Sequence, residues 1–166
     1  MQTEALRNLV AKIKHLQCEM QTVELKATNK GCPTRLYDTL SSFANQDEGG
    51  VIVFGIDEIK GFDVVGVYDA QDLQKKVTEQ CNQMSPCVRA LFTVCEIDDK
   101  VVVSAEIPGL DVAERPCFYR GTGRLKGAYI RVGDADEPMS EYEIYSYDAF
   151  RKRIRDDIRE ATGARR

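Results

Sequence analysis

The sequence predicts an α+β domain in which helices pack on a mixed, largely antiparallel sheet. Three observations support this class: an apolar stripe at helical spacing near the N-terminus, several short β-branched runs, and glycine or aspartate turns between those runs. With 166 residues, of which 43% are apolar, the chain has the size of one domain with a sizeable core. The expected order of elements is αβαββαβββα.

The first half of the chain is expected to contain two helices, a strand and a hairpin. Apolar residues at helical spacing predict the first helix, and they are Leu6, Leu9, Val10, Ile13 and Leu16. Val23–Lys26 alternates apolar and charged side chains, which is typical of a short strand. A second helix is expected over residues 33–45, and a strand over residues 51–56 follows a Gly-Gly turn. Residues 64–67 are the expected hairpin partner of that strand.

The second half is expected to begin with a helix whose N-cap is Asp69. Residues 91–97 and 101–107 are β-branched runs separated by Asp-Asp-Lys, so they predict a second hairpin. A long connection then leads to a strand over residues 128–132.

A last helix is predicted from Ser140, which forms a capping-box pattern with Glu143. Residues 1–150 are expected to form one domain. Residues 151–166 contain seven basic and three acidic side chains, and they are expected to be a basic helix end or a linker to a missing domain. Their charge fits a solvated helix face or a nucleic-acid contact.

Composition limits the classes of partner. The net charge is −4 and the pI is about 5.2, so a nucleic-acid surface must be a local patch. No apolar run is long enough to span a bilayer, and the N-terminus reads as an amphipathic helix, so no membrane partner is expected. Six cysteines without a C-x-x-C pair are typical of reduced thiols, which favours a cytoplasmic location.

The largest charge asymmetry lies in residues 115–131, which contain five basic and no acidic side chains: Arg115, Arg120, Arg124, Lys126 and Arg131. Glycines and aromatic residues lie among them, so the segment could offer guanidinium groups and stacking faces to a polyanion. The alternative is a surface hairpin whose charges meet the acidic residues that follow it. Lys26, Lys30 and Arg35 could line the same face.

Nucleotide hydrolysis and histidine-dependent hydrolysis find no support in the sequence. The glycines of residues 121–127 do not have G-x-G-x-x-G spacing, and no Walker loop is present. A single histidine, His15, does not provide a nucleophile relay. Three carboxylates, Glu19, Glu24 and Asp57, could together hold Mg²⁺ or Mn²⁺. They could equally be ordinary strand, turn and helix-end residues, in which case no cofactor is expected.

Four separated blocks of sequence resemble one family. They are Glu24-Leu25-Lys26, Phe43-Ala44-Asn45 with Gly49-Gly50, residues 53–57 with 65–67, and Arg115-Pro116 with residues 129–133. In this order they resemble the Schlafen AlbA-type domain, also known as a divergent AAA domain. The resemblance implies a DNA-binding module at the front of bacterial transcriptional regulators. In RNA-cleaving members, a glutamate, a second glutamate five residues later and an aspartate hold the metal, and Glu19, Glu24 and Asp57 resemble that trio by position.

Three functions therefore remain open from the sequence. The first is a DNA-binding domain of a transcriptional regulator, in which phosphate contacts give weak sequence preference and steep salt dependence. The second is a divalent-metal-dependent endoribonuclease. The third is an oligomerisation or sensor module, in which strand edges or the last helix pair with a second copy.

Overall fold

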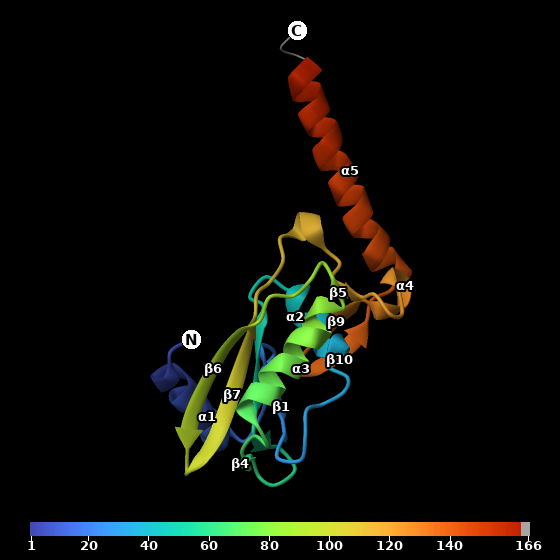
Figure 1. The fold of residues 1–166 in the computed structure, drawn as a ribbon. Helices are drawn as coiled ribbons and strands as arrows, with labels where there is room; N and C mark the ends of the chain where they lie inside the picture. Colours follow the sequence, from blue (N-terminus) through green and yellow to red (C-terminus); the bar gives the residue numbers. More distant parts are fainter. Residues whose placement is uncertain (164–166) are drawn as a thin grey trace.

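The fold is described from a computed structural model, which describes residues 1–163 (Figure 1). The helices are α1 (Thr3–Leu16), α2 (Tyr37–Ala44), α3 (Ala70–Asn82), α4 (Arg124–Gly127), α5 (Glu141–Gly163) and the 3₁₀ turn η1 (Val112–Glu114). The longer strands are β1 (Val23–Lys26), β2 (Gly50–Phe54), β6 (Leu91–Ile97), β7 (Lys100–Ile107), β9 (Tyr129–Val132) and β10 (Ala135–Pro138). Two-residue strands are β3 (Ile56–Asp57), β4 (Asp63–Val64), β5 (Met84–Ser85) and β8 (Phe118–Tyr119).

The central sheet has the strand order β1-β2-β7-β6. β1 runs parallel to β2, whereas β2 with β7 and β7 with β6 are antiparallel. The β6–β7 turn places Asp98 and Asp99 at φ of 52° and 60°, which the tight two-residue hairpin requires. Both the mixed sheet and its mainly antiparallel pairing confirm the predicted fold class.

Each face of the sheet is covered by different helices. Alternate side chains of β2 divide between the faces: Ile52 and Phe54 join the core under α2 and α3, whereas Val53 joins the core under α1. Gly50 permits the close packing of α2, because a Cβ at this position would lie 2.4 Å from the Phe43 ring. Gly49 has a φ of 64°, and a Cβ there would lie 2.1 Å from the Ile107 carbonyl oxygen, so the Gly-Gly pair reflects contacts with both β7 and α2.

The last third of the chain adds a smaller layer beside α2. β9 and β10 form a hairpin, β8 pairs with β5, and a small core forms from Ala128, Met139 and Ile144. Only the beginning of α5 packs here, and the helix then extends away from the body (Figure 1). The predicted division at residue 150 falls within this continuous helix, and Arg151 donates hydrogen bonds to the carbonyls of Ala113 and Arg115.

Several boundaries differ from the sequence prediction. α2 begins at Tyr37, because residues 33–36 form an irregular segment that Gln80 holds in place. Gln80 Oε1 accepts the Leu36 N–H, and its Nε2 donates to the Pro33 carbonyl. The hairpin partner of β3 is only Asp63–Val64. Asp69 caps α3, and Ser140 and Glu143 form the predicted capping box. Within residues 1–163, no helix has the length and apolar character needed to cross a bilayer.

Candidate nucleic-acid interface

Arg131 lies in the interior of the domain. Its side chain is 0% exposed, and its Nη1 lies 2.9 Å from both Glu24 Oε2 and Asp136 Oδ1. The guanidinium also donates to the Val23 carbonyl at 3.1 Å and lies 5.0 Å from the Phe43 ring centroid. Because two carboxylates neutralise this charge and the protein covers it, Arg131 joins β1, α2 and the β9–β10 hairpin and does not face solvent.

Arg115 is buried as well. Its Nη2 pairs with Asp47 Oδ1 at 2.7 Å, and its Nε donates to the Leu110 carbonyl at 3.0 Å. The side chain is 8% exposed, so its N–H groups form hydrogen bonds with the surrounding loop and do not face solvent. Arg115 thus fastens the segment after β7 to the end of α2.

Ser41 of α2 and Asn45, the residue that caps the C-terminus of α2, hold the basic segment in place. Asn45 Nδ2 donates to the carbonyls of Cys117 and Tyr129 at 3.1 and 3.0 Å, and its Oδ1 accepts from the Cys117 N–H at 2.7 Å. The Ser41 hydroxyl donates to the Cys117 carbonyl and accepts from the Tyr129 N–H. These bonds tie the segments around Cys117 and Tyr129 to the end of α2, which gives the Phe-Ala-Asn block a structural role.

The middle of the basic segment faces solvent. Arg120 is exposed and its Nη2 donates to the Asn82 carbonyl at 2.6 Å. Arg124 is half-buried and pairs with Asp148 of α5. Lys126 is exposed and makes no ion pair with any residue in the described range. The segment that looked uniform in sequence therefore has buried ends and an accessible centre.

A pocket of about 240 Å³ lies beside this centre, between the start of α2 and the β8–α4 loop. We call it the tyrosine pocket, and its lining consists of Thr34, Arg35, Tyr37, Asp38, Tyr119, Thr122, Lys126 and Tyr129. Tyr37 and Tyr119 stack with their ring centroids 3.7 Å apart and 13° between their planes. The pocket thus combines aromatic surface with two cations.

The glycines around α4 fit the loop onto Tyr119. A Cβ at Gly121 would lie 2.3 Å from the Tyr119 ring, and a Cβ at Gly127 would lie 2.6 Å from the Tyr119 carbonyl oxygen. Gly123 also donates its N–H to that carbonyl at 3.1 Å. These glycines shape one wall of the tyrosine pocket, and their irregular spacing reflects this packing.

The three basic residues from the first part of the chain occupy different environments. Arg35 lines the tyrosine pocket and pairs with Asp38 at 3.5 Å. Asp38, and after it the Tyr129 hydroxyl, raise the pKa of Arg35. Lys26 lies 3.3 Å from Glu24, beside the buried Arg131 network. Lys30 is exposed in the loop after β1 and makes no ion pair within residues 1–163.

The three candidate metal ligands do not form a metal site. Glu24 forms ion pairs with Arg131 and Lys26. Asp57 accepts a hydrogen bond from the Ile59 N–H within its own turn. Among residues 1–163, no group of three histidine, cysteine, aspartate or glutamate side chains is arranged to hold a metal ion. The residues present therefore do not fit the divalent ion that the resemblance to RNA-cleaving members implies.

Glu19 stands apart from the other two because of its environment. Its carboxylate accepts the N–H of Leu25, within β1, at 3.0 Å. Burial raises the pKa of Glu19 to about 7, the Leu25 hydrogen bond opposes this shift, and the charge of Glu24 adds to it. Glu19 therefore changes its charge near neutral pH.

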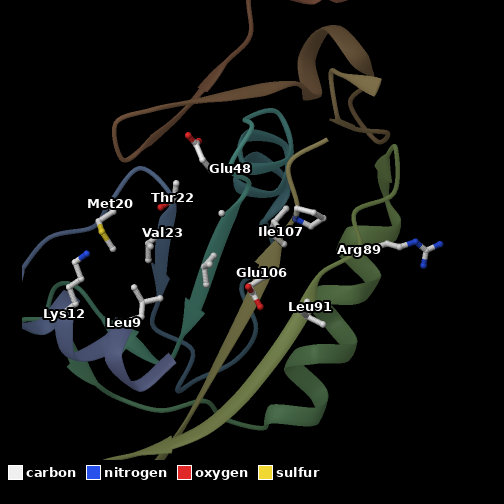
Figure 2. Close-up of a pocket in the computed structure, with 13 residues that line it drawn as sticks. Leu9, Lys12, Met20, Thr22, Val23, Glu48, Arg89, Leu91, Glu106 and Ile107 are labelled. Atoms are coloured by element: carbon white, nitrogen blue, oxygen red, sulfur yellow. The ribbon is translucent and has the colours of Figure 1, made fainter. Parts of the chain in front are cut away.

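A larger cavity, of about 730 Å³, lies elsewhere, over the end of the sheet beside α1 (Figure 2). Its floor is apolar and includes Val23, Val51 and Leu91. Figure 2 shows Lys12 and Arg89 on opposite sides of this cavity, and Glu48 and Glu106 also line it. Two acidic residues balance the two basic ones in this cavity. Its electrostatic attraction for a polyanion is therefore weaker than that of the tyrosine pocket.

The family described as Schlafen, AlbA_2 matches residues 19–140 of this chain. The chain belongs to this Schlafen AlbA_2 family. The match spans most of the chain, from Glu19 before β1 to Ser140 at the start of α5. The family points to a nucleic-acid-binding domain. Among curated proteins, none matches this Schlafen AlbA_2 chain.

Two solved structures share the fold. The solution structure of the N-terminal domain of an ATP-dependent DNA helicase RecG-related protein from Nitrosomonas europaea matches with a TM-score of 0.60 and 24% identity, covering 80% of this chain and 91% of that one. The crystal structure of the DIP2311 protein from Corynebacterium diphtheriae matches with a TM-score of 0.56 and 17% identity. The second match covers 87% of this chain and 32% of the other.

Most of the cations at this surface are evident from the sequence, whereas the pocket is not. Arg35, Lys126 and the aromatic character of Tyr119 and Tyr129 were visible in the sequence. Tyr37 was not singled out, because it lies in α2, 82 residues before Tyr119, and only the fold stacks the two rings. The helical turn of α4 was also missed, because four residues carry no periodic signal.

Proposed function

We propose that this Schlafen AlbA_2 domain is the DNA-binding domain of a transcriptional regulator, and that it contacts phosphates through the exposed cations around the tyrosine pocket. The observation that supports this proposal most is the grouping of Arg35 and Lys126 with three tyrosines in one pocket. Arg120, which is exposed in the same β8–α4 segment, extends the positive charge along the chain, whereas Arg124 is paired with Asp148. The family supplies independent support for nucleic acid as the ligand.

Physical chemistry defines what kind of binding such a surface gives. Phosphate contacts by lysine and arginine release counterions, so affinity falls steeply as salt rises. Guanidinium groups bind phosphate oxygens with two parallel hydrogen bonds, which strengthens each contact. Phosphates are the same at every step of a strand, so sequence preference is expected to be weak. The overall charge of −4 makes this local patch the favoured point of approach for a polyanion.

One structural relative is consistent with this proposal. The Nitrosomonas europaea domain is the N-terminal part of a protein described as related to a DNA helicase. By analogy, the domain described here would bring a protein to DNA while another part acts. We also propose that the domain ends near residue 150 and that α5 connects it to a further domain.

The proposal is tested by fluorescence anisotropy of a labelled random-sequence DNA duplex at low and moderate salt. Replacing Arg120, Arg124 and Lys126 together with alanine is expected to weaken binding on the order of tenfold or more at moderate salt. The matched control replaces three exposed lysines elsewhere, Lys12, Lys60 and Lys75, and so removes the same charge. Equal affinity of the first variant and the wild type would contradict this placement of the surface.

A further inference from the structure

We infer that the tyrosine pocket receives one unpaired nucleobase, and that the domain consequently binds single-stranded nucleic acid more tightly than duplex of the same sequence. This inference rests on the proposed function and specifies the form of its ligand. Arg35 and Lys126 neutralise the phosphates beside that base, while the aromatic rings provide a stacking surface for it. The unpaired base is the shared chemistry, and it can belong to a DNA or an RNA strand.

The size of the pocket favours a single base. Pockets for drug-sized molecules begin at roughly 300 Å³. The tyrosine pocket, at about 240 Å³, is smaller. A pocket of this size suits one planar ring system that belongs to a longer ligand, with the rest of the strand lying outside.

The aromatic groups supply the stacking partner that a base needs. Tyr37 and Tyr119 pack partly against the main core, but all three tyrosines, Tyr129 included, line the pocket and remain partly exposed, so part of each ring stays accessible. The Tyr37–Tyr119 stack is fixed on one side by glycine contacts with Tyr119 and on the other by the Tyr37 hydroxyl, which donates to Gln83 Oε1 at 3.1 Å. A stack held in place loses little side-chain freedom when a base packs against it.

The polar groups of the pocket match the remaining chemistry of a nucleotide. The Arg35 side chain is 69% exposed and its contact with Asp38 is long, so solvent screens this ion pair and Arg35 can turn to a phosphate at little cost. Lys126 makes no ion pair within the described residues and is available directly. Asp38 provides a carboxylate that accepts an N–H from the edge of a base.

A duplex cannot fill this pocket without disruption. Its bases are stacked and paired, so placing one in the pocket requires flipping it out, which costs a few kcal/mol. An unpaired strand has less stacking to lose and no base pair to break. Two parts of the site therefore contribute to affinity in different ways. The cations attract any nucleic acid, whereas the tyrosine pocket favours an unpaired base.

The test compares anisotropy titrations of one labelled oligonucleotide as single-stranded DNA, as the same sequence in RNA, and as a blunt DNA duplex. Wild-type protein is expected to bind one or both single strands on the order of tenfold more tightly than duplex. Tyr129→Leu is expected to remove most of that difference, measured as the ratio of single-strand to duplex affinity. Tyr142→Leu is the matched control, because Tyr142 is 83% exposed on α5, outside the pocket.

A second measurement keeps the inference testable if Tyr129→Leu folds poorly. Wild-type protein is irradiated with single-stranded DNA that contains 5-iodouracil, and the crosslinked peptide is mapped by mass spectrometry. Crosslinks at Tyr37, Tyr119 or Tyr129 are expected. Equal affinity for single strand and duplex, or crosslinks only outside the pocket, would overturn the inference while leaving the proposed function intact. Failure of the wild type to bind any nucleic acid would instead contradict the proposed function.

Discussion

The ends and the centre of residues 115–131 make the most instructive comparison in this molecule. At the ends, Arg115 and Arg131 are buried, paired with carboxylates and bonded to backbone carbonyls. In the centre, Arg120 and Lys126 are exposed beside the tyrosine pocket. The same residue types thus hold the fold together in one place and are available to a ligand in another.

The difference arises from where acidic partners lie in the fold. Glu24 and Asp136 reach Arg131 from β1 and β10, and Asp47 reaches Arg115 from the turn between α2 and β2. Burying a charge is tolerated only where such partners and hydrogen bonds compensate for lost hydration. A run of basic residues therefore does not define a binding surface until its partners are known.

Removing Arg131 should give the largest effect. Arg131→Met leaves the carboxylates of Glu24 and Asp136 without their buried partner, and the free energy of unfolding is expected to fall by about 3–5 kcal/mol. Urea denaturation followed by circular dichroism measures this loss. The matched change Arg124→Met breaks a half-exposed ion pair and should cost about 0–1 kcal/mol. Similar losses for both variants would remove the distinction between buried and exposed arginines.

The second largest effect is expected at Asn45. Asn45→Ala leaves the buried Cys117 N–H and the Tyr129 carbonyl without their side-chain partner, whereas the Cys117 carbonyl keeps the Ser41 hydroxyl. Each unsatisfied buried group costs about 1–3 kcal/mol, and relaxation reduces the sum, so a loss of about 2–3 kcal/mol is expected in the same denaturation assay. Asn8→Ala, at an exposed position of α1, is the control. A loss below about 1 kcal/mol would show that α2 does not hold the basic segment.

A smaller, pH-dependent effect is expected at Glu19. Burial raises the pKa of Glu19 in the folded state to about 7, from a usual value of 4.5, so the folded protein favours the protonated carboxyl. This contribution to stability is complete below pH 4.5 and is lost as the pH rises through about 7.

Glu19→Gln keeps an acceptor for the Leu25 N–H and removes the charge. At pH 8 the variant should have a Tm higher than the wild type by up to about 3 °C, because solvent screens a partly exposed group, and at pH 4.5 the two should agree. Thermal melts at both pH values measure this. Glu137→Gln, at an exposed position, should show no such change. A variant less stable than the wild type at pH 8 would contradict the buried environment of Glu19.

The smallest effect on stability, with a clear effect on binding, is expected at Lys126. Lys126→Ala should change the free energy of unfolding by less than about 0.5 kcal/mol, because the side chain is exposed. The slope of log affinity against log salt should become shallower by about 0.9, the contribution of one phosphate contact. Anisotropy titrations over a series of salt concentrations measure the slope. Lys75→Ala, on α3, should leave it unchanged.

Local signals predicted much of the fold. Helical spacing predicted α1, Asp69 marked the start of α3, and Ser140 with Glu143 marked the start of α5. The β6–β7 hairpin followed from β-branched runs around Asp98 and Asp99. These features depend on residues close in sequence, so periodicity and capping chemistry reveal them.

The candidate site depended on contacts that sequence does not encode locally. Asp47 lies 68 residues before Arg115, and β5 and β8 are two-residue strands that form only because the fold brings them together. The stack of Tyr37 on Tyr119 likewise joins α2 to β8. The sequence therefore indicated which residues are basic, and the tertiary structure decided which of them face a ligand.

The most direct test of this account is one pair of double variants in a nucleic-acid binding titration. Arg35→Ala with Lys126→Ala removes the two cations of the tyrosine pocket, whereas Lys12→Ala with Arg89→Ala removes two cations of the larger cavity. Anisotropy with single-stranded DNA at moderate salt should show a loss of affinity on the order of tenfold for the first variant and less than about threefold for the second. Equal losses, or no loss in either variant, would contradict the claim that this domain binds nucleic acid at the tyrosine pocket.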